Sequence, residues 1–151
     1  MKKILILIIT ITTLLSCSKD DCTTPIIPPQ IFTFEIVDKI TGENLFTNGT
    51  YQPEQIQITN TDNNFLTEFT FISENNINHI EINLSYAYAY WETGIVKLKI
   101  DISNNHIFDV YADGEIIMRE CFSYYEYNEI TIGESEFELD NQTGIYKILV
   151  E

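Results

Sequence analysis

Three cysteines and two histidines are the side chains of this chain best suited to chemistry. The cysteines are Cys17, Cys22 and Cys121, and the histidines are His79 and His106. A thiol can be acylated, oxidised to a disulfide or bound to a metal, and an imidazole can bind a metal or carry a proton. The residues around each side chain decide which of these chemistries is available.

The residues before Cys17 have the pattern of a secretory signal. Met1-Lys2-Lys3 is followed by the uncharged run 4–15, which is shorter than the roughly 20 apolar residues of a transmembrane helix. The run ends in Leu14-Leu15-Ser16-Cys17, which resembles the lipobox read by bacterial lipoprotein signal peptidase. This resemblance implies cleavage before Cys17 and a lipid on its thiol. Each CH₂ of the lipid buried in the bilayer contributes about 0.8 kcal/mol to membrane binding. The alternative is a plain secreted protein with an unrelated cysteine at this place.

The residues after Cys17 carry a second resemblance. Ser18, Lys19, Asp20 and Asp21 are similar to the export signal of lipoproteins of the Bacteroidota phylum, which implies display on the outer face of the outer membrane. The alternative is a protein that faces the periplasm, with the acidic pair acting as a solvated spacer. The predicted organisation is a signal peptide at 1–16, a lipidated, proline-containing flexible tether at 17–30 and one domain at 31–151.

The charge of the chain limits its partners. It has 23 acidic and 8 basic residues, a formal net charge of −15. Such a surface repels phosphate backbones and anionic headgroups, so we expect no nucleic-acid partner and a membrane contact made through lipid. With Cys17 lipidated, Cys22 and Cys121 remain as a pair in an oxidising compartment, which suggests a disulfide between them. The alternative is a buried free thiol at Cys121.

From Ile31 onward, β-branched and aromatic residues alternate with polar ones in short segments between Asn, Asp, Gly and Ser clusters. This pattern predicts an all-β fold, an antiparallel β-sandwich of immunoglobulin-like or jelly-roll-like type, with a small β-barrel as the alternative. The strands are expected at 31–38, 55–60, 65–72, 79–90, 95–103, 106–112, 115–122, 125–132, 134–139 and 145–150.

Asp113-Gly114 predicts a type I′ turn between two of these strands, because such turns need positive φ angles. In that hairpin His106 faces Cys121, and the core face holds Phe108, Val110, Ile117 and Cys121. A histidine and a cysteine alone do not make a zinc site, which needs four ligands.

The segment Ile36-Val37-Asp38-Lys39-Ile40-Thr41-Gly42-Glu43-Asn44-Leu45 resembles the first strand and turn of carboxypeptidase-regulatory-like domains. These are immunoglobulin-like sandwiches common on bacterial surface proteins. The chain continues as Phe46-Thr47-Asn48-Gly49-Thr50-Tyr51, without the proline and glycine that follow the turn in that family. As a whole, the chain resembles the short uncharacterised lipoproteins of flavobacteria more than any enzyme, and neither resemblance carries over a catalytic residue.

Tyr86, Tyr88 and Tyr90 are the most distinctive candidate ligand site. Strand alternation puts the three rings on one face. If exposed, they form a platform for a sugar or another protein. The alternative is that they fill one sheet face as cross-strand aromatic pairs with Tyr125 and Tyr127.

The sequence contains no nucleophile elbow and no zinc-ligand spacing such as His-x-x-x-His, so we expect no enzymatic activity, metal or cofactor. Acidic and amide side chains gather at 101–105 and 109–115. Their spacing matches no calcium loop, so ordinary solvated turns are expected there. The alternation around His79 predicts that this side chain faces solvent.

These patterns together predict a lipid-anchored cell-envelope lipoprotein whose sandwich is a non-catalytic binding module for a glycan or a protein. One alternative is a structural or accessory subunit of an envelope complex. The other is an unrecognised hydrolase.

Overall fold

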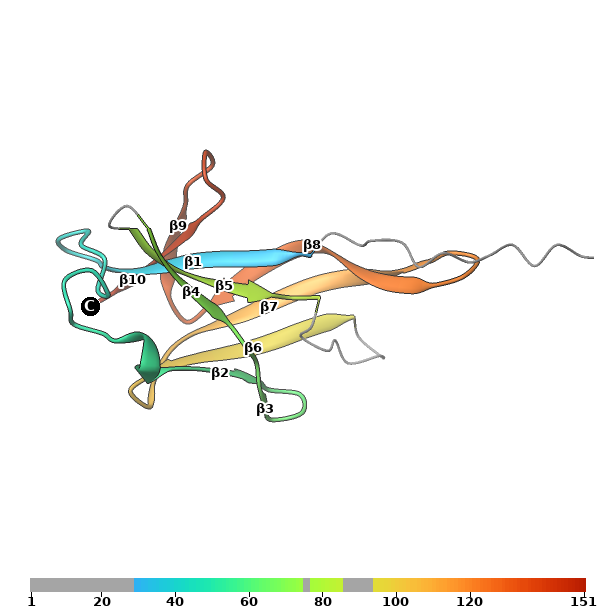
Figure 1. Cartoon of the computed structure of the whole chain (residues 1–151), viewed down its shortest axis with the longest axis horizontal. Coiled ribbons are helices and arrows are strands. Elements are labelled where there is room, and N and C mark those ends of the chain that lie inside the picture. Colours follow the sequence, from blue (N-terminus) through green and yellow to red (C-terminus); the bar gives the residue numbers. More distant parts are fainter. Residues whose placement is uncertain (1–28, 75–76, 86–93) are drawn as a thin grey trace, which may run out of the picture.

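The computed structural model describes residues 29–74, 77–85 and 94–151, except for the side chain of Tyr125. These residues form two five-stranded sheets (Figure 1). The first sheet contains β1 (Ile31–Asp38), β4 (Thr70–Glu74), β5 (Ile77–Asn83), β9 (Glu136–Leu139) and β10 (Tyr146–Val150). The second contains β2 (Ile56–Asn60), β3 (Phe65–Leu66), β6 (Ile95–Ile102), β7 (Asn105–Met118) and β8 (Ser123–Gly133), and the short 3₁₀ helix η1 (Pro53–Gln55) precedes β2. The strand orders are β4-β5-β1-β10-β9 and β3-β2-β6-β7-β8.

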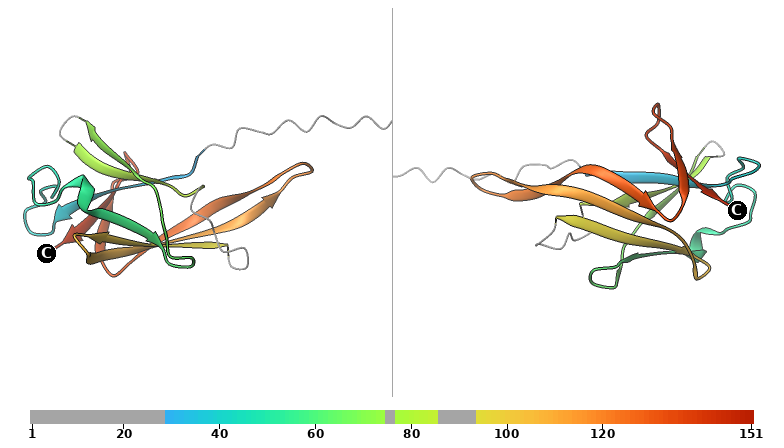
Figure 2. Two further views of the ribbon diagram at one scale, coloured as in Figure 1. Left: turned by 60° about the horizontal axis from the view of Figure 1, so that its bottom comes forward. Right: turned by 180° about the vertical axis from the view of Figure 1, so that it is seen from behind.

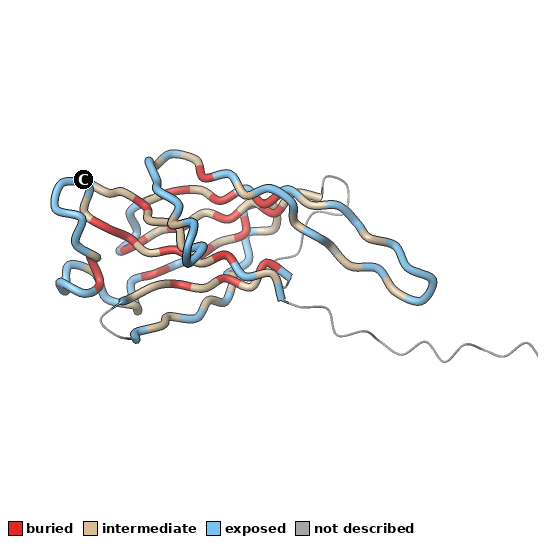
Figure 3. Tube along the Cα trace, turned by 90° about the horizontal axis from the view of Figure 1, so that it is seen from above, coloured by how far each residue is buried: buried red, intermediate tan, exposed pale blue. Residues whose placement is uncertain are grey.

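The core lies between the two sheets and follows the alternation of the sequence. Every second residue of β6 is buried, and buried residues also alternate with less buried ones along β2 and most of β1 (Figure 3). Phe34 of β1 meets Phe108 of β7 edge to face, with ring centroids 5.1 Å apart, and both rings are fully buried. A single apolar cluster contains residues from both sheets. The all-β sandwich is therefore confirmed, as two separate sheets rather than one closed barrel.

Strand β1 has the predicted bounds, and β2, β6, β8, β9 and β10 lie within two residues of theirs. The predicted strand 65–72 is instead two strands in different sheets, because the chain crosses the sandwich between Leu66 and Thr70. Strand β5 ends at Asn83, earlier than the predicted strand, whose residues from 86 onward lie outside the described residues.

The first and last strands lie side by side. β1 and β10 pair in parallel, with Phe34 opposite Tyr146 and Asp38 opposite Val150. The other strand pairs of the described residues are antiparallel, as expected. The parallel pair joins the two halves of the first sheet through residues more than a hundred positions apart, a pairing that local sequence patterns do not encode.

The predicted turn at Asp113-Gly114 is wrong. β7 continues through both residues, and Asp113 pairs with Ile95 of β6 on one side and Glu129 of β8 on the other. Neither residue has a positive φ angle. Pairing with strands on both sides keeps this backbone extended and overrides its turn propensity.

The structure requires a glycine at position 114 for a reason other than a turn. The β7–β8 register shifts between Asp113 and Gly114, and a Cβ on Gly114 would lie 2.7 Å from the carbonyl oxygen of Glu126. The two strands therefore approach too closely at this irregularity for a side chain.

The observed turns lie on either side of the predicted one. Ser103 and Asn104 have φ angles of 52° and 64° and join β6 to β7, which is the two-residue geometry expected of a type I′ turn. Further on, the N–H of Arg119 donates to the carbonyl of Phe122 and closes the turn between β7 and β8. The β7–β8 hairpin extends past the rest of the sandwich (Figure 2). Cys121 therefore lies exposed in a turn, and His106 pairs with Asp101 rather than with Cys121.

Candidate functional site

Most of the site residues predicted from the sequence lie outside the described residues. They are the lipobox and lipidation residues Leu14, Leu15, Ser16 and Cys17, the export residues Ser18, Lys19, Asp20 and Asp21, the half-cystine candidate Cys22, and Tyr86, Tyr88 and Tyr90. In the part of the chain that is described, no helix is long and apolar enough to cross a membrane.

Cys121 is disulfide-bonded. The alternative of a buried free thiol is wrong, because the residue is exposed and its sulfur is oxidised. Pairing with Cys22 stays a prediction.

A groove of about 520 Å³ opens where the chain crosses from the second sheet to the first. Its apolar lining comes from the exposed side chains of Phe65 and Leu66, each 70% accessible, and from Phe69 and Ile31. Phe65 follows a loop in which its N–H donates to the side-chain oxygen of Asn63, and Asn64 has a φ angle of 59°. The short loop therefore holds the aromatic ring on the outside of the fold.

Polar groups surround this apolar surface. The groove is lined by the amides Asn60, Asn63 and Asn83, the hydroxyls Thr67 and Thr70, and the carboxylates Glu68 and Glu81. Amides donate and accept hydrogen bonds, whereas ionised carboxylates only accept them. The groove thus offers rings and methyl groups for stacking together with both kinds of hydrogen-bonding partner, and its ionisable groups are acidic.

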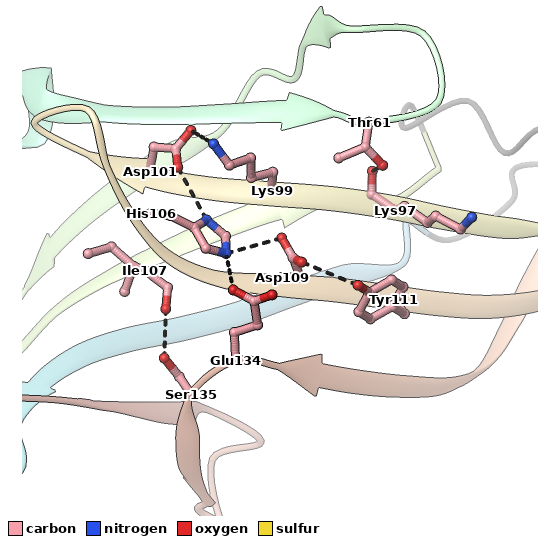
Figure 4. Close-up of polar contacts among 10 residues, drawn as sticks. All are labelled: Thr61, Lys97, Lys99, Asp101, His106, Ile107, Asp109, Tyr111, Glu134 and Ser135. Carbon is pink, nitrogen blue, oxygen red and sulfur yellow. Dashed lines mark hydrogen bonds and ion pairs between the residues drawn. The ribbon is translucent and has the colours of Figure 1, made fainter.

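A second cluster surrounds His106 at the start of β7 (Figure 4). Its Nδ1 lies 3.2 Å from Oδ1 of Asp101 on β6. Its Nε2 lies 3.5 Å from Oδ1 of Asp109 and 3.1 Å from Oε2 of Glu134. The nitrogen of His106 and one oxygen each of Asp109 and Glu134 all lie within 4.8 Å of one another, so these three residues could hold a metal ion.

A β-bulge brings these side chains to one face. His106 and Asp109 are three residues apart and would lie on opposite faces of a regular strand. Phe108 pairs with Ile100, but the next pair is His106 with Asp101, so Ile107 is an extra residue in β7. The hydroxyl of Ser135, just after Glu134, donates to the carbonyl of Ile107 at 2.7 Å. The bulge therefore turns His106 toward Asp109 and also anchors the segment that carries Glu134.

Each aspartate of the cluster is oriented by a further side chain. Lys99 binds the second oxygen of Asp101 at 2.9 Å, and the hydroxyl of Tyr111 donates to the second oxygen of Asp109 at 3.2 Å. The negative charge of Asp109 raises the pKa of Tyr111, and partial burial, this hydrogen bond and Glu134 act in the same direction. Negative potential therefore gathers on this face of β7.

His79 has a different environment. Its neighbours Ile80 and Ile82 are buried, as the alternation predicts, but the His79 side chain is only 17% exposed. Ile72 lies directly opposite His79 on β4, and Nε2 of His79 lies 3.7 Å from Oε1 of Glu81. The expectation that His79 faces solvent is thus only partly right, because the neighbouring strand shields it.

The groove and the His106 cluster were not predicted from the sequence. The groove depends on the crossing of the chain between the two sheets. The His106 cluster depends on the bulge at Ile107 and on Glu134, which follows the end of β8. The runs 101–105 and 109–115 do contain two cluster members, but no sequence signal joins them to Glu134.

No protein-family model, curated protein or solved structure matches the chain. We therefore infer its function from the groove and the chemistry of its residues.

Proposed function

We propose that the protein is a lipid-anchored lipoprotein of the cell envelope whose sandwich domain binds a glycan, without catalysis, in the groove at Phe65. The observation that supports this proposal is the exposed ring of Phe65 beside Leu66, with amide and hydroxyl side chains around it. An aromatic ring left 70% accessible on a small domain is suited to stacking on the apolar face of a sugar.

The polar lining favours an uncharged glycan. Asn63, Asn83 and Thr67 can exchange hydrogen bonds with sugar hydroxyls in both directions. Glu68 and Glu81 can accept hydrogen bonds from hydroxyls but repel sulfate and uronate groups. The acidic balance of the whole chain acts in the same direction. A neutral oligosaccharide is therefore the expected ligand.

A glycan array probed with the full chain, followed by calorimetry on the best neutral ligand, tests the proposal. Phe65→Ala should weaken binding by about fivefold or more, since loss of one aromatic stacking partner costs roughly 1–3 kcal/mol where nucleic-acid bases are the ligand. Ile40→Ala is a matched control, because Ile40 is 89% exposed and does not line the groove. Equal binding by the two variants, or no neutral glycan ligand at all, would contradict the proposal.

A hydrolase is the competing function, because Glu68 and Glu81 line the same groove and paired carboxylates cleave glycosidic bonds. Incubation of the bound oligosaccharide with the protein distinguishes the two. Binding without new reducing ends supports the binding module. Release of reducing ends that is lost in both Glu68→Gln and Glu81→Gln would replace it with a glycosidase.

The anchor has its own test. Cys17→Ser should abolish incorporation of labelled fatty acid, and label that persists would contradict lipidation. Surface display predicts that external protease digests the protein in intact cells and that alanines at Lys19, Asp20 and Asp21 protect it. Equal protection of both proteins would favour the periplasmic side.

A further inference from the structure

The imidazole of His106 lies among the carboxylates of Asp101, Asp109 and Glu134. A neutral imidazole has one N–H and one lone pair. In the tautomer whose Nδ1–H donates to Asp101 at 3.2 Å, Nε2 presents its lone pair to oxygens of Asp109 and Glu134. Three acceptor atoms then lie within 4.8 Å of one another, an arrangement that a bound cation would stabilise.

We propose that His106, Asp109 and Glu134 form a binding site for a divalent transition metal of the zinc class. Zinc binds imidazole nitrogen and carboxylate oxygen at about 2.0–2.2 Å, so tetrahedral donors lie about 3.3–3.6 Å apart. The separation from Nε2 to the Asp109 oxygen is 3.5 Å, which lies within this range, and the separation to the Glu134 oxygen is 3.1 Å, which is slightly shorter (Figure 4). All three donor atoms lie within 4.8 Å of one another. Three protein ligands leave a fourth position for water or a donor atom of a bound molecule.

Asp101 has the role of the outer partner. Histidines that ligate metals usually donate their other N–H to a carboxylate, which fixes the tautomer and the ring orientation. Asp101 accepts that bond, and Lys99 holds its second oxygen at 2.9 Å. Tyr111 holds the free oxygen of Asp109 in the same way. The side chains around the site therefore orient its ligands before any ion arrives.

The ligand chemistry favours zinc over calcium or magnesium. Calcium takes six to eight oxygens, and magnesium keeps near-octahedral oxygen ligands, whereas imidazole suits the transition metals. The site shares no residue with the groove at Phe65, so its fate is independent of the proposed glycan function.

Calorimetric titration of the full chain with zinc alone, under non-reducing conditions, tests the site. One equivalent should bind saturably, and a large excess of magnesium should not displace it. Asp101→Asn should weaken zinc binding by about 10–100-fold, as loss of an outer partner does, and His106→Ala and Asp109→Asn should weaken it at least as much. His79→Ala should leave zinc affinity unchanged, because among the described residues that histidine lies beside one carboxylate, that of Glu81. Circular dichroism of each variant confirms folding.

Nitrogen NMR of the imidazoles gives a readout that folding alone would not move. On addition of zinc, Nε2 of His106 should shift as a metal ligand while Nδ1 keeps its proton. Absence of saturable binding, equal affinity for magnesium, or unchanged zinc binding in His106→Ala would each overturn the proposal.

Discussion

The edge-to-face contact between Phe34 and Phe108 joins the two sheets, and replacing either ring should measure what that contact contributes. Both rings are fully buried, and their planes meet at 80°. Truncation of a buried phenylalanine to alanine costs about 3–5 kcal/mol through lost burial and the cavity that remains. Aromatic pairs add about 0.5–1.5 kcal/mol beyond burial. The double variant should therefore lose less than the sum of the two single variants by that amount.

Urea unfolding of the full chain, followed by circular dichroism, provides the free energies. A domain of this size has a stability of about 5–15 kcal/mol, so Phe34→Leu and Phe108→Leu accompany the alanine variants in case the latter do not fold. Phe65→Ala is the control, because an exposed ring should change stability by no more than about 0.5 kcal/mol. Additive losses would refute the direct contact. Losses of under about 1 kcal/mol for both core variants would refute burial of the rings and with it this packing of the sheets.

Gly114→Ala should lower the urea midpoint more than Gly42→Ala, because a Cβ at 114 meets the backbone of Glu126 whereas Gly42 has a positive φ angle but open space around it; the reverse order would contradict the close approach of β7 and β8. The pKa of Asp38 is lowered below 3.8 by hydrogen bonds from the backbone N–H groups of Thr41 and Ile40 and from the Thr41 hydroxyl. The ionised carboxylate therefore stabilises the folded state above that pH, and this stabilisation is lost as pH falls through the folded pKa. Asp38→Asn should thus flatten the acid limb of the stability curve, and an unchanged limb would exclude the carboxylate as its source. If Cys121 pairs with Cys22, the bond closes a loop of about 100 residues, and Cys121→Ser should cost up to about 4.7 kcal/mol. Non-reducing peptide mapping that links Cys121 to Cys17 instead would contradict both this pairing and lipidation.

The sequence by itself determined most of the segments that become strands and the faces that β1 and β6 bury. Alternation along β1 and β6 is strong enough to place Phe32, Phe34, Val96 and Leu98 in a core, since a strand with one apolar face must cover it. The same local rule fails at Asp113-Gly114. Turn propensity there is worth little beside the hydrogen bonds that β7 makes to strands on both sides.

Only the tertiary structure decided where chemistry could occur. Phe65 becomes part of a groove because the chain changes sheets a few residues later. His106 meets Asp109 because one extra residue, Ile107, reverses the alternation of β7, and it meets Glu134 because β8 ends beside that bulge. Periodic patterns encode the two faces of a strand, whereas bulges, crossings and strand neighbours result from packing between segments that are distant in sequence.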